Sequence, residues 1–361
     1  MTLDASPFHA RAVEANRLNA WENRGRFTLA AHYGSVAEEA IAARLGAVLG
    51  DVSWHWRVEL SGDQAPALVS RLFTRDAAAL GIGAAMEVLW LNDAGAVRGQ
   101  GTVIRLERTR FLLVSAADDI DWIDAAARLY RVRVEDRTRM EGALALIGPA
   151  AEKILKAAGL EVGLSPLSLR RLDWRGLPVS LARLGLGVTI GCSADDAPVV
   201  WDRLFAAGRP FALMPAGQAA LDILEIESGI VHPLRDYTPA HEGFAAVPTP
   251  QALGLSALVD RAHLFNGRAG VLAAGPVTAL AGFLVEGEPP PPGTPVQNGT
   301  ETVGRTLGSR FSPAMQQVIA MAALPDPAPE GPFTIGGSIC RPVELPFLPN
   351  PAATEPEGSA V

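Results

Sequence analysis

The chain has 361 residues, of which 48% are hydrophobic and 19% charged, and its formal net charge at pH 7 is −8. This length predicts two or three domains with cores of their own, and the composition excludes a disordered or collagen-like chain. The acidic balance argues against a nucleic acid or an anionic membrane as partner.

The basic side chains are almost all arginine, because Lys153 and Lys156 are the only lysines among 31 basic residues. Lysine-imine chemistry is therefore disfavoured, whereas recognition of carboxylates by guanidinium groups is well supplied. Cys192 and Cys340 lie far apart, and no pattern of metal ligands, apolar leader or membrane-spanning run is evident. We expect a cytoplasmic protein without a metal ion.

The first part of the chain predicts a mixture of helices and antiparallel strands. Residues 1–30 are expected to be helical, because apolar residues recur there at three- and four-residue steps. Further elements are expected as helices at 36–49, 64–73 and 119–130, and as strands at 51–60, 85–90, 101–106, 111–115 and 132–135, with a hairpin turn at 91–95. Strands that follow one another with helices between them indicate an α+β architecture.

A change of pattern near residue 141 predicts a second unit. Its strands are expected at 143–147, 167–174 and 177–184, and its helices from 148, at 197–207 and at 217–228. Beyond residue 250, short strands with dense Pro and Gly predict a small β-barrel, in which 312–320 is the longest expected helix. We therefore expect α+β subdomains at 1–140 and 141–249, a C-terminal β-barrel domain at 250–348 and a flexible tail at 349–361.

Several short segments follow one another in a characteristic order. They are His32-Tyr33-Gly34-Ser35 with Glu38, Asp51-Val52-Ser53, Leu91-Asn92-Asp93-Ala94-Gly95, Ala145-Leu146-Ile147-Gly148-Pro149-Ala150, Leu221–Gly229, Asp236-Tyr237-Thr238, and Val303-Gly304 with Phe311-Ser312-Pro313-Ala314-Met315. Together they resemble the aminomethyltransferase family, which comprises the glycine-cleavage T-protein and related folate-dependent demethylases. The resemblance implies a three-subdomain cloverleaf, with two mixed antiparallel α/β subdomains and a C-terminal β-barrel around a channel for tetrahydrofolate.

The positions that hold folate in the family are changed in this chain. The family's pair of aspartates after the hairpin falls on Gly99-Gln100, and its pterin-binding glutamate falls on Thr189. Its "ARD" arginine falls on Leu221. A carboxylate makes charge-assisted hydrogen bonds worth roughly 1.5–3 kcal/mol each, of which a threonine recovers a small part. We therefore expect no cofactor, and tetrahydrofolate only in an alternative function.

Three functions are compatible with these changes. We favour a folate-independent lyase, either a decarboxylase or an enzyme that releases a one-carbon fragment, acting on a small anionic and preferably aromatic compound. The alternative is a tetrahydrofolate-dependent demethylase or aminomethyltransferase. The third is a non-catalytic binding module with the same fold, because fold similarity alone does not decide function. The expected partner is a small anionic molecule, and a homodimer is left open.

His55 lies between two tryptophans in the expected strand 51–60. Alternation would place its imidazole on one face with Ser53, and Trp54 and Trp56 on the other. A hydroxyl and an imidazole on one face provide groups for general acid–base catalysis, and we assign Ser53 and Trp54 to substrate binding. A half-buried histidine with a purely structural role is the alternative.

His32 and Tyr33 lie in a loop that resembles a channel-facing segment of the family. The phenol could donate a hydrogen bond to an anionic substrate or accept its proton after a pKa shift. The alternative is a histidine that caps the next helix and a tyrosine that covers the core. Thr189 is assigned to substrate binding, because it occupies the position of the pterin-binding glutamate.

Two groups of arginines are candidate anion-binding residues. Arg98 stands beside the lost carboxylates, where a guanidinium favours an anionic substrate and stabilises developing negative charge. Arg98 could instead face solvent. His232, Arg235, Asp236 and Tyr237 follow the Gly229 helix stop in a loop, where functional side chains concentrate, and Asp236 could orient either basic partner. An Asp–Arg pair with a structural role is the alternative there.

Overall fold

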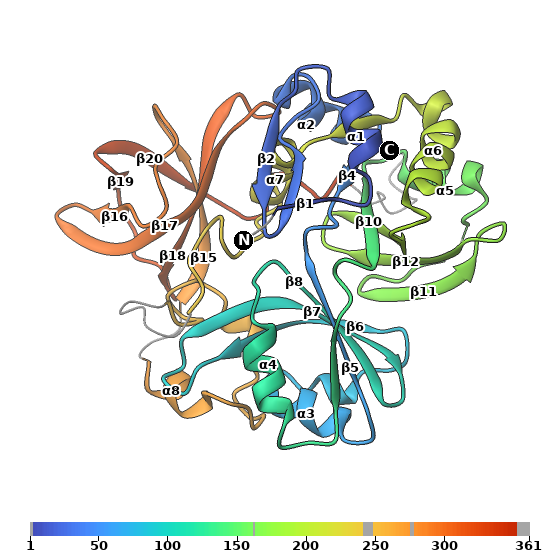
Figure 1. The fold of residues 1–361 in the computed structure, drawn as a ribbon. Coiled ribbons are helices and arrows are strands. Elements are labelled where there is room, and N and C mark those ends of the chain that lie inside the picture. The colour runs from blue at the N-terminus through green and yellow to red at the C-terminus, as the bar shows by residue number, and fades with distance from the viewer. Residues whose placement is uncertain (1–2, 162, 241–247, 275–277, 352–361) are drawn as a thin grey trace, which may run out of the picture. The chain divides into compact units, whose positions relative to one another are not determined.

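The computed structural model describes residues 3–161, 163–240, 248–274 and 278–351, and Figure 1 shows their ribbon. Contacts divide the chain into two units built from separate segments. Unit 1 comprises residues 1–54, 139–228 and 348–361, and unit 2 comprises residues 55–138 and 229–347. The subdomain boundaries expected after residues 140 and 249 remain a prediction. Within the described ranges, no helix is long and apolar enough to cross a membrane.

Unit 1 begins with a small three-stranded sheet. Its elements are β1 (Asp4–Ala5), α1 (His9–Ala15), β2 (Trp21–Arg24) and β3 (Phe27–Ala30), and the strand order is β1-β3-β2. The expectation of helix throughout 1–30 is therefore wrong. The amide of Asn16 bonds both main-chain groups of Ala20, and Asn19 and Gly25 adopt left-handed φ angles of 52° and 55°. The Asn16 bonds close a turn directly after α1, and the left-handed residues at 19 and 25 prevent a helix from running through the rest of this segment.

The helix and the strand expected at 36–49 and 51–60 are each shorter than predicted. Helix α2 (Val36–Leu45) begins at the N-cap Ser35 and is followed by β4 (Val48–Asp51). The chain then turns at residues 53–54, and β5 (Trp56–Ser61) begins in a different sheet. The Asp51 carboxylate accepts the main-chain N–H of Ser53 at 2.9 Å, which is the bond that makes an Asp residue turn the chain. The single strand expected at 51–60 is therefore wrong.

The main sheet of unit 1 has six strands in the order β11-β12-β13-β10-β4-β14. Its further elements are β10 (Glu141–Ile147), α5 (Ala151–Ala158), β11 (Ser168–Asp173), β12 (Pro178–Leu184), β13 (Gly187–Ser193), α6 (Ala197–Gly208), η2 (Arg209–Phe211), β14 (Met214–Ala216) and α7 (Gln218–Glu227). One face packs against α5 and α6 in a core that includes Leu144, Leu146 and Ile190. The strands and helices expected between 143 and 228 are confirmed.

Unit 2 contains an antiparallel five-stranded sheet in the order β6-β7-β8-β5-β9. Its elements are α3 (Ala65–Leu72), η1 (Ala77–Ala79), β6 (Ala85–Leu91), β7 (Val97–Glu107), β8 (Arg110–Ser115), α4 (Ile120–Ala127) and β9 (Arg133–Asp136). Residues of α3 and α4 pack in one core with Val88, Trp90 and Phe111. The predicted hairpin turn is confirmed, with Gly95 at a φ of +82° that favours glycine.

The remainder of unit 2 contains a closed barrel in the order β15-β18-β17-β16-β19-β20. Before it come η3 (Ser256–Leu258) and α8 (Arg268–Ala273), and the barrel strands are β15 (Thr278–Val285), β16 (Pro295–Asn298), β17 (Glu301–Ser312), β18 (Gln317–Pro325), β19 (Phe333–Ile335) and β20 (Ser338–Val343). The predicted barrel is confirmed, but the helix expected at 312–320 is wrong. The Ser312 hydroxyl accepts the N–H of Met315, and Gln316 has a φ of 55°, so a tight turn joins two strands instead.

Candidate active site

Two imidazoles lie together in unit 2. The ring centroids of His55 and His232 are 5.9 Å apart, and both residues are half-buried. His232 Nδ1 lies 2.8 Å from the carbonyl oxygen of Pro233. Since a carbonyl only accepts, Nδ1 carries the proton, and in the neutral ring Nε2 carries the lone pair. The sequence singled out each histidine separately, and the structure brings the two together.

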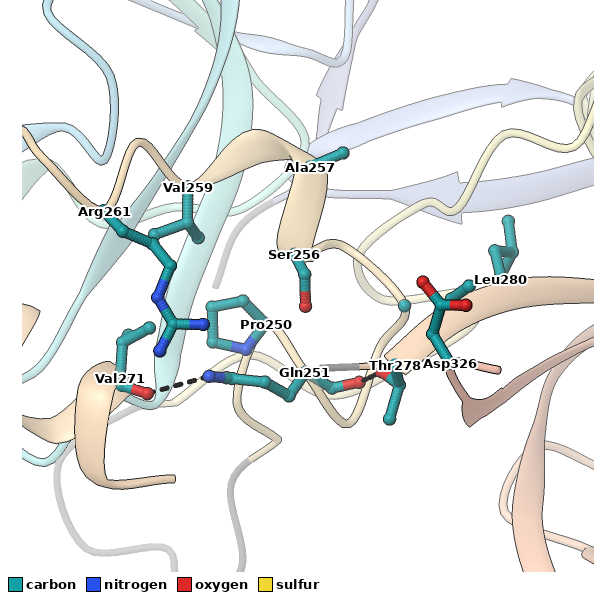
Figure 2. Close-up of a pocket in the computed structure, with 12 residues that line it drawn as sticks. Pro250, Gln251, Ser256, Ala257, Val259, Arg261, Val271, Thr278, Leu280 and Asp326 are labelled. Atoms are coloured by element: carbon teal, nitrogen blue, oxygen red, sulfur yellow. Dashed lines mark hydrogen bonds between the residues drawn. The ribbon is translucent and has the colours of Figure 1, made fainter. Parts of the chain in front are cut away.

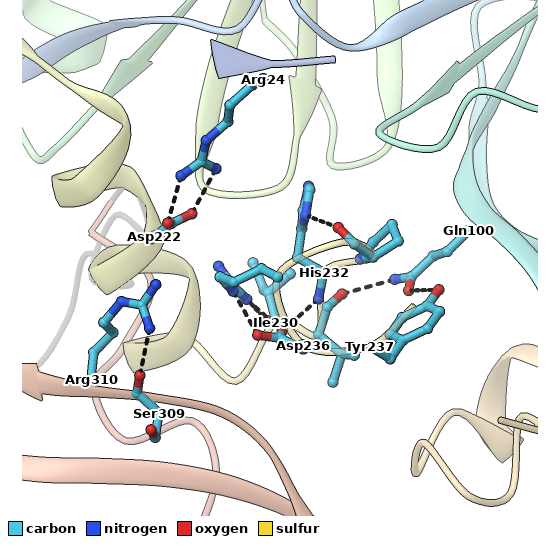
Figure 3. Close-up of polar contacts among 12 residues, drawn as sticks. Arg24, Gln100, Asp222, Ile230, His232, Asp236, Tyr237, Ser309 and Arg310 are labelled. Carbon is cyan, nitrogen blue, oxygen red and sulfur yellow. Dashed lines mark hydrogen bonds and ion pairs between the residues drawn. The ribbon is translucent and has the colours of Figure 1, made fainter. Parts of the chain in front are cut away.

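The loop after α7 is fixed by a buried ion pair. Arg235 donates from Nε and Nη2 to the two carboxylate oxygens of Asp236, both at 2.7 Å, and a further bond reaches the Ile230 carbonyl at 2.8 Å. The Asp236 side chain is 0% exposed and also accepts the main-chain N–H of His232 at 2.7 Å. Figure 3 shows these bonds converging on Asp236. The pair therefore holds the backbone that carries His232.

Gln100 lies where the family has a carboxylate, and its side-chain amide is bonded at both ends. Nε2 donates to the Val231 carbonyl at 3.1 Å, and the Tyr237 hydroxyl donates to Oε1 at 3.3 Å (Figure 3). A carboxylate here would face the Val231 carbonyl with no proton to share, so the amide fits and an acid does not. Burial, and secondarily the charge of Asp236, raises the pKa of Tyr237 far above its ordinary value. Tyr237 is therefore a hydrogen-bond donor at neutral pH.

Arg98 is buried and paired. Its Nε and Nη2 donate to the two Asp119 oxygens at 2.8 and 2.6 Å, and its guanidinium carbon lies 5.0 Å from the centroid of the Trp122 ring. Trp90 Nε1 donates to Asp119 at 2.8 Å. The alternative that Arg98 faces solvent is wrong, because only 7% of the residue is exposed. Its assignment to anion binding stays a prediction, and the pairing gives it a structural role as well.

In unit 1, Glu39 organises the loop that carries His32 and Tyr33. Its carboxylate, 1% exposed, accepts the main-chain N–H groups of Tyr33 at 2.7 Å, Gly34 at 2.9 Å and Gly217 at 2.8 Å. Burial, followed by the charges of Asp51 and Glu39, raises the pKa of the Tyr33 phenol far above its ordinary value. Tyr33 therefore remains protonated at neutral pH and acts as a donor rather than a base.

Two acidic residues in unit 1 have well-defined partners. Asp51 accepts the Ser6 hydroxyl at 2.5 Å as well as the Ser53 N–H, and Ser53 itself bridges to Ala143. Asp222 accepts both terminal nitrogens of Arg24, at 2.9 and 2.6 Å, as Figure 3 shows. The Arg24 guanidinium carbon lies 5.5 Å from the centroid of the Trp54 ring. Trp54 and Ser53 are therefore buried in unit 1, whereas His55 is the first residue of unit 2.

On the sheet face of unit 1 opposite the core, one row of paired residues is small and neutral. In the strand register, Gly50 pairs with Ala145, Ala145 with Thr189, and Thr189 with Ala182. The Leu221 side chain covers Gly50 so closely that a Cβ at Gly50 would lie 2.8 Å from it. Along this row Thr189 contributes a hydroxyl and no residue contributes a charge.

The positions that the resemblance assigns to folate binding carry other groups in each unit. In unit 1, Thr189 has a hydroxyl where the resemblance implies a pterin-binding carboxylate, and Leu221 has an isobutyl group where it implies a guanidinium. In unit 2, Gln100 has an amide where it implies an acid, and this amide is bonded to Val231 and Tyr237. Among the described residues, no cluster of three His, Cys, Asp or Glu side chains has the arrangement of a metal site.

The described chain combines α+β sheets with a closed six-stranded barrel, the architecture that the resemblance implies. Residues 8–260 match the family of the GCVT N-terminal domain. The aminomethyltransferase of Symbiobacterium thermophilum is 32% identical over 321 residues, which are 83% of this chain and 84% of that protein. The chain therefore belongs to the glycine-cleavage T-protein family.

Two further proteins bear on fold and chemistry. The crystal structure of the glycine cleavage system aminomethyltransferase T from Bartonella henselae has a TM-score of 0.83 and 22% identity, covering 98% of this chain and 100% of that one, which shows the fold. A trimethylamine-oxide aldolase from Ruegeria pomeroyi is 27% identical over 307 residues, 79% of this chain and 38% of that protein. The relatives thus include both a transferase and an aldolase.

The sequence analysis missed Glu39 and Asp119, whose roles depend on partners elsewhere in the chain. A single glutamate is a weak signal in a sequence, because the three N–H groups that Glu39 binds come from two separate segments.

Proposed function

We propose that the protein is a folate-independent lyase that releases a one-carbon unit by cleaving a carbon–carbon bond of a small anionic, preferably aromatic, compound. The observation that carries the proposal is the replacement of the family's folate anchors by Thr189, Leu221 and the Gln100 amide, which is bonded at both ends. The aldolase relative supports a lyase reaction on this scaffold.

Unit 2 supplies the groups for proton transfer. The lone pair at Nε2 of His232 can take the proton of a substrate hydroxymethyl group, with the Pro233 carbonyl holding the opposite nitrogen in the required tautomer. The carbon–carbon bond then breaks and releases formaldehyde. Its electron pair remains on the substrate carbon, which a conjugated ring or carbonyl of the substrate stabilises.

The same carbon is then protonated, so that the reaction needs no oxidant or reductant. His55 stands next to His232 and can return a proton, and Tyr237, which stays protonated, can donate a hydrogen bond to the developing anion. For a decarboxylase, the cleavage releases CO₂ and the same protonation completes the reaction. The roles assigned to His32, Tyr33, Ser53, Trp54 and Thr189, which belong to unit 1, stay predictions.

The second candidate is a tetrahydrofolate-dependent demethylase or aminomethyltransferase. It is favoured by aminomethyltransferase relatives such as that of Thermus thermophilus, which is 31% identical over 343 residues, 90% of this chain and 93% of that protein. The two functions are separated by their need for the cofactor. The purified protein is incubated with hydroxymethyl-, carboxyl- and methoxy-substituted aromatic acids, with and without tetrahydrofolate, and formaldehyde, CO₂ and methylated folate are measured.

We expect formaldehyde or CO₂ without tetrahydrofolate, and a His232→Gln variant that loses about 10²–10⁴-fold in turnover. The matched control is His9→Gln, a half-exposed histidine of unit 1. Turnover that requires tetrahydrofolate would establish the second candidate instead. Saturable binding of these acids with no product of any kind would leave a non-catalytic module.

A further inference from the structure

A cavity of about 450 Å³ lies in unit 2 beside the first strand of the barrel. Its walls come from the loop between residues 250 and 261, from α8, from the start of β15 and from Asp326 after β18 (Figure 2). The volume falls in the range of small-molecule sites in proteins. None of its lining residues belongs to the groups described above.

Gln251 places an unsatisfied acceptor at this cavity. The residue is 4% exposed, and its Nε2 donates to the Val271 carbonyl at 2.8 Å. Because that carbonyl can only accept, the amide nitrogen must face it, which fixes the orientation of the side chain. The oxygen Oε1 is buried and accepts no hydrogen bond within the described part of the chain.

Ser256 provides a second unsatisfied group. Its hydroxyl, on the first residue of η3, is buried and has no hydrogen-bond partner among residues 3–161, 163–240, 248–274 and 278–351. Figure 2 shows the hydroxyl pointing from η3 toward Pro250 and Gln251. Buried polar atoms of native proteins are nearly always bonded, so two orphaned atoms in one cavity indicate a missing partner.

Opposite charges flank these two atoms. Arg261 and Asp326 both line the cavity, and no ion pair involves either side chain in the described ranges. Figure 2 shows them on either side of Ser256. A guanidinium binds carboxylates through paired N–H groups, and a carboxylate accepts hydrogen bonds from an ammonium group.

We propose that this cavity binds a small zwitterion whose ammonium and carboxylate ends are separated by an amide, as in a dipeptide. The amide N–H donates to Gln251 Oε1, and the amide carbonyl accepts from the Ser256 hydroxyl. The carboxylate end pairs with Arg261 and the ammonium end with Asp326. A free α-amino acid has both charges on one carbon and no amide between them, so it satisfies fewer of these groups.

Glycylglycine is the probe, and its binding to the full chain is measured by isothermal titration calorimetry. We expect saturable binding, weakened about tenfold or more in Arg261→Gln and in Asp326→Asn, since each removes one charge-assisted contact. Ser256→Ala should weaken it less. The matched controls are Arg108→Gln and Asp93→Asn, exposed residues of unit 2 outside the cavity.

Truncated probes assign each charge to its partner. N-acetylglycine lacks the ammonium group, so Asp326→Asn should not weaken its binding further, whereas glycylglycinamide lacks the carboxylate and should be insensitive to Arg261→Gln. No saturable binding of glycylglycine, or equal affinities for the parent and both charge variants, would overturn the proposal. Both substituted residues are exposed, so circular dichroism of each variant should match the parent protein.

Discussion

Replacing Arg98 with methionine tests whether the buried pair in unit 2 holds the sheet together. The variant loses two hydrogen bonds to Asp119, of 2.8 and 2.6 Å, and the contact with the Trp122 ring. The Asp119 side chain, which is 5% exposed, then keeps its hydrogen bond from Trp90 Nε1 but loses the positive charge of Arg98. Removing one partner of a buried ion pair costs about 3–5 kcal/mol, and the lost ring contact adds roughly 0.5–1 kcal/mol.

Urea unfolding followed by tryptophan fluorescence measures this loss as a change in the free energy of unfolding. The control is Arg128→Met, which breaks an exposed pair of 3.6 Å and should cost less than about 1 kcal/mol. A double variant, Arg98→Met with Asp119→Leu, should recover much of the loss, because no charge is left buried. If Arg98→Met costs no more than the control, the guanidinium does not stabilise the fold, and the reasoning fails.

Three further predictions follow from the same contacts. Tyr33 and Tyr237 have pKa values raised above the ordinary 10.0, so the stability that their protonated phenols contribute is fully present below pH 10 and is lost as the pH rises further. In an alkaline titration, the ultraviolet absorbance of neither phenolate should appear before the protein unfolds. Glu39→Ala leaves three main-chain N–H groups without their acceptor, of which that of Gly217 is buried and the other two are part-buried, and it should lower stability by about 2–3 kcal/mol in thermal unfolding. An effect as small as that of Glu38→Ala would contradict the role assigned to Glu39. Thr189→Glu should tighten tetrahydrofolate binding about tenfold in calorimetry, and unchanged affinity would show that this position does not hold the pterin.

Local patterns in the sequence determined much of the fold, and the proposed loss of the folate anchors also rests on the sequence. The hairpin at Asn92–Gly95 and the barrel follow from turn residues and strand periods, which act over a few residues. Where prediction failed, a local hydrogen bond overrode periodicity, as at Asn16, which ends the first helix, and Asp51, which turns the chain before β5. The changes at Thr189 and Gln100 could be predicted from the residue types alone, because they concern which side chain is present at a position.

The tertiary structure decided which side chains act together. His55 lies beside His232 because the loop after α7 packs near the start of β5. Arg98 pairs with Asp119 because the N-terminus of α4 packs beside β7. Glu39 reaches Gly217 across a similar separation. Such pairs depend on how strands and loops assemble in three dimensions, and the period of a single segment carries no information about them.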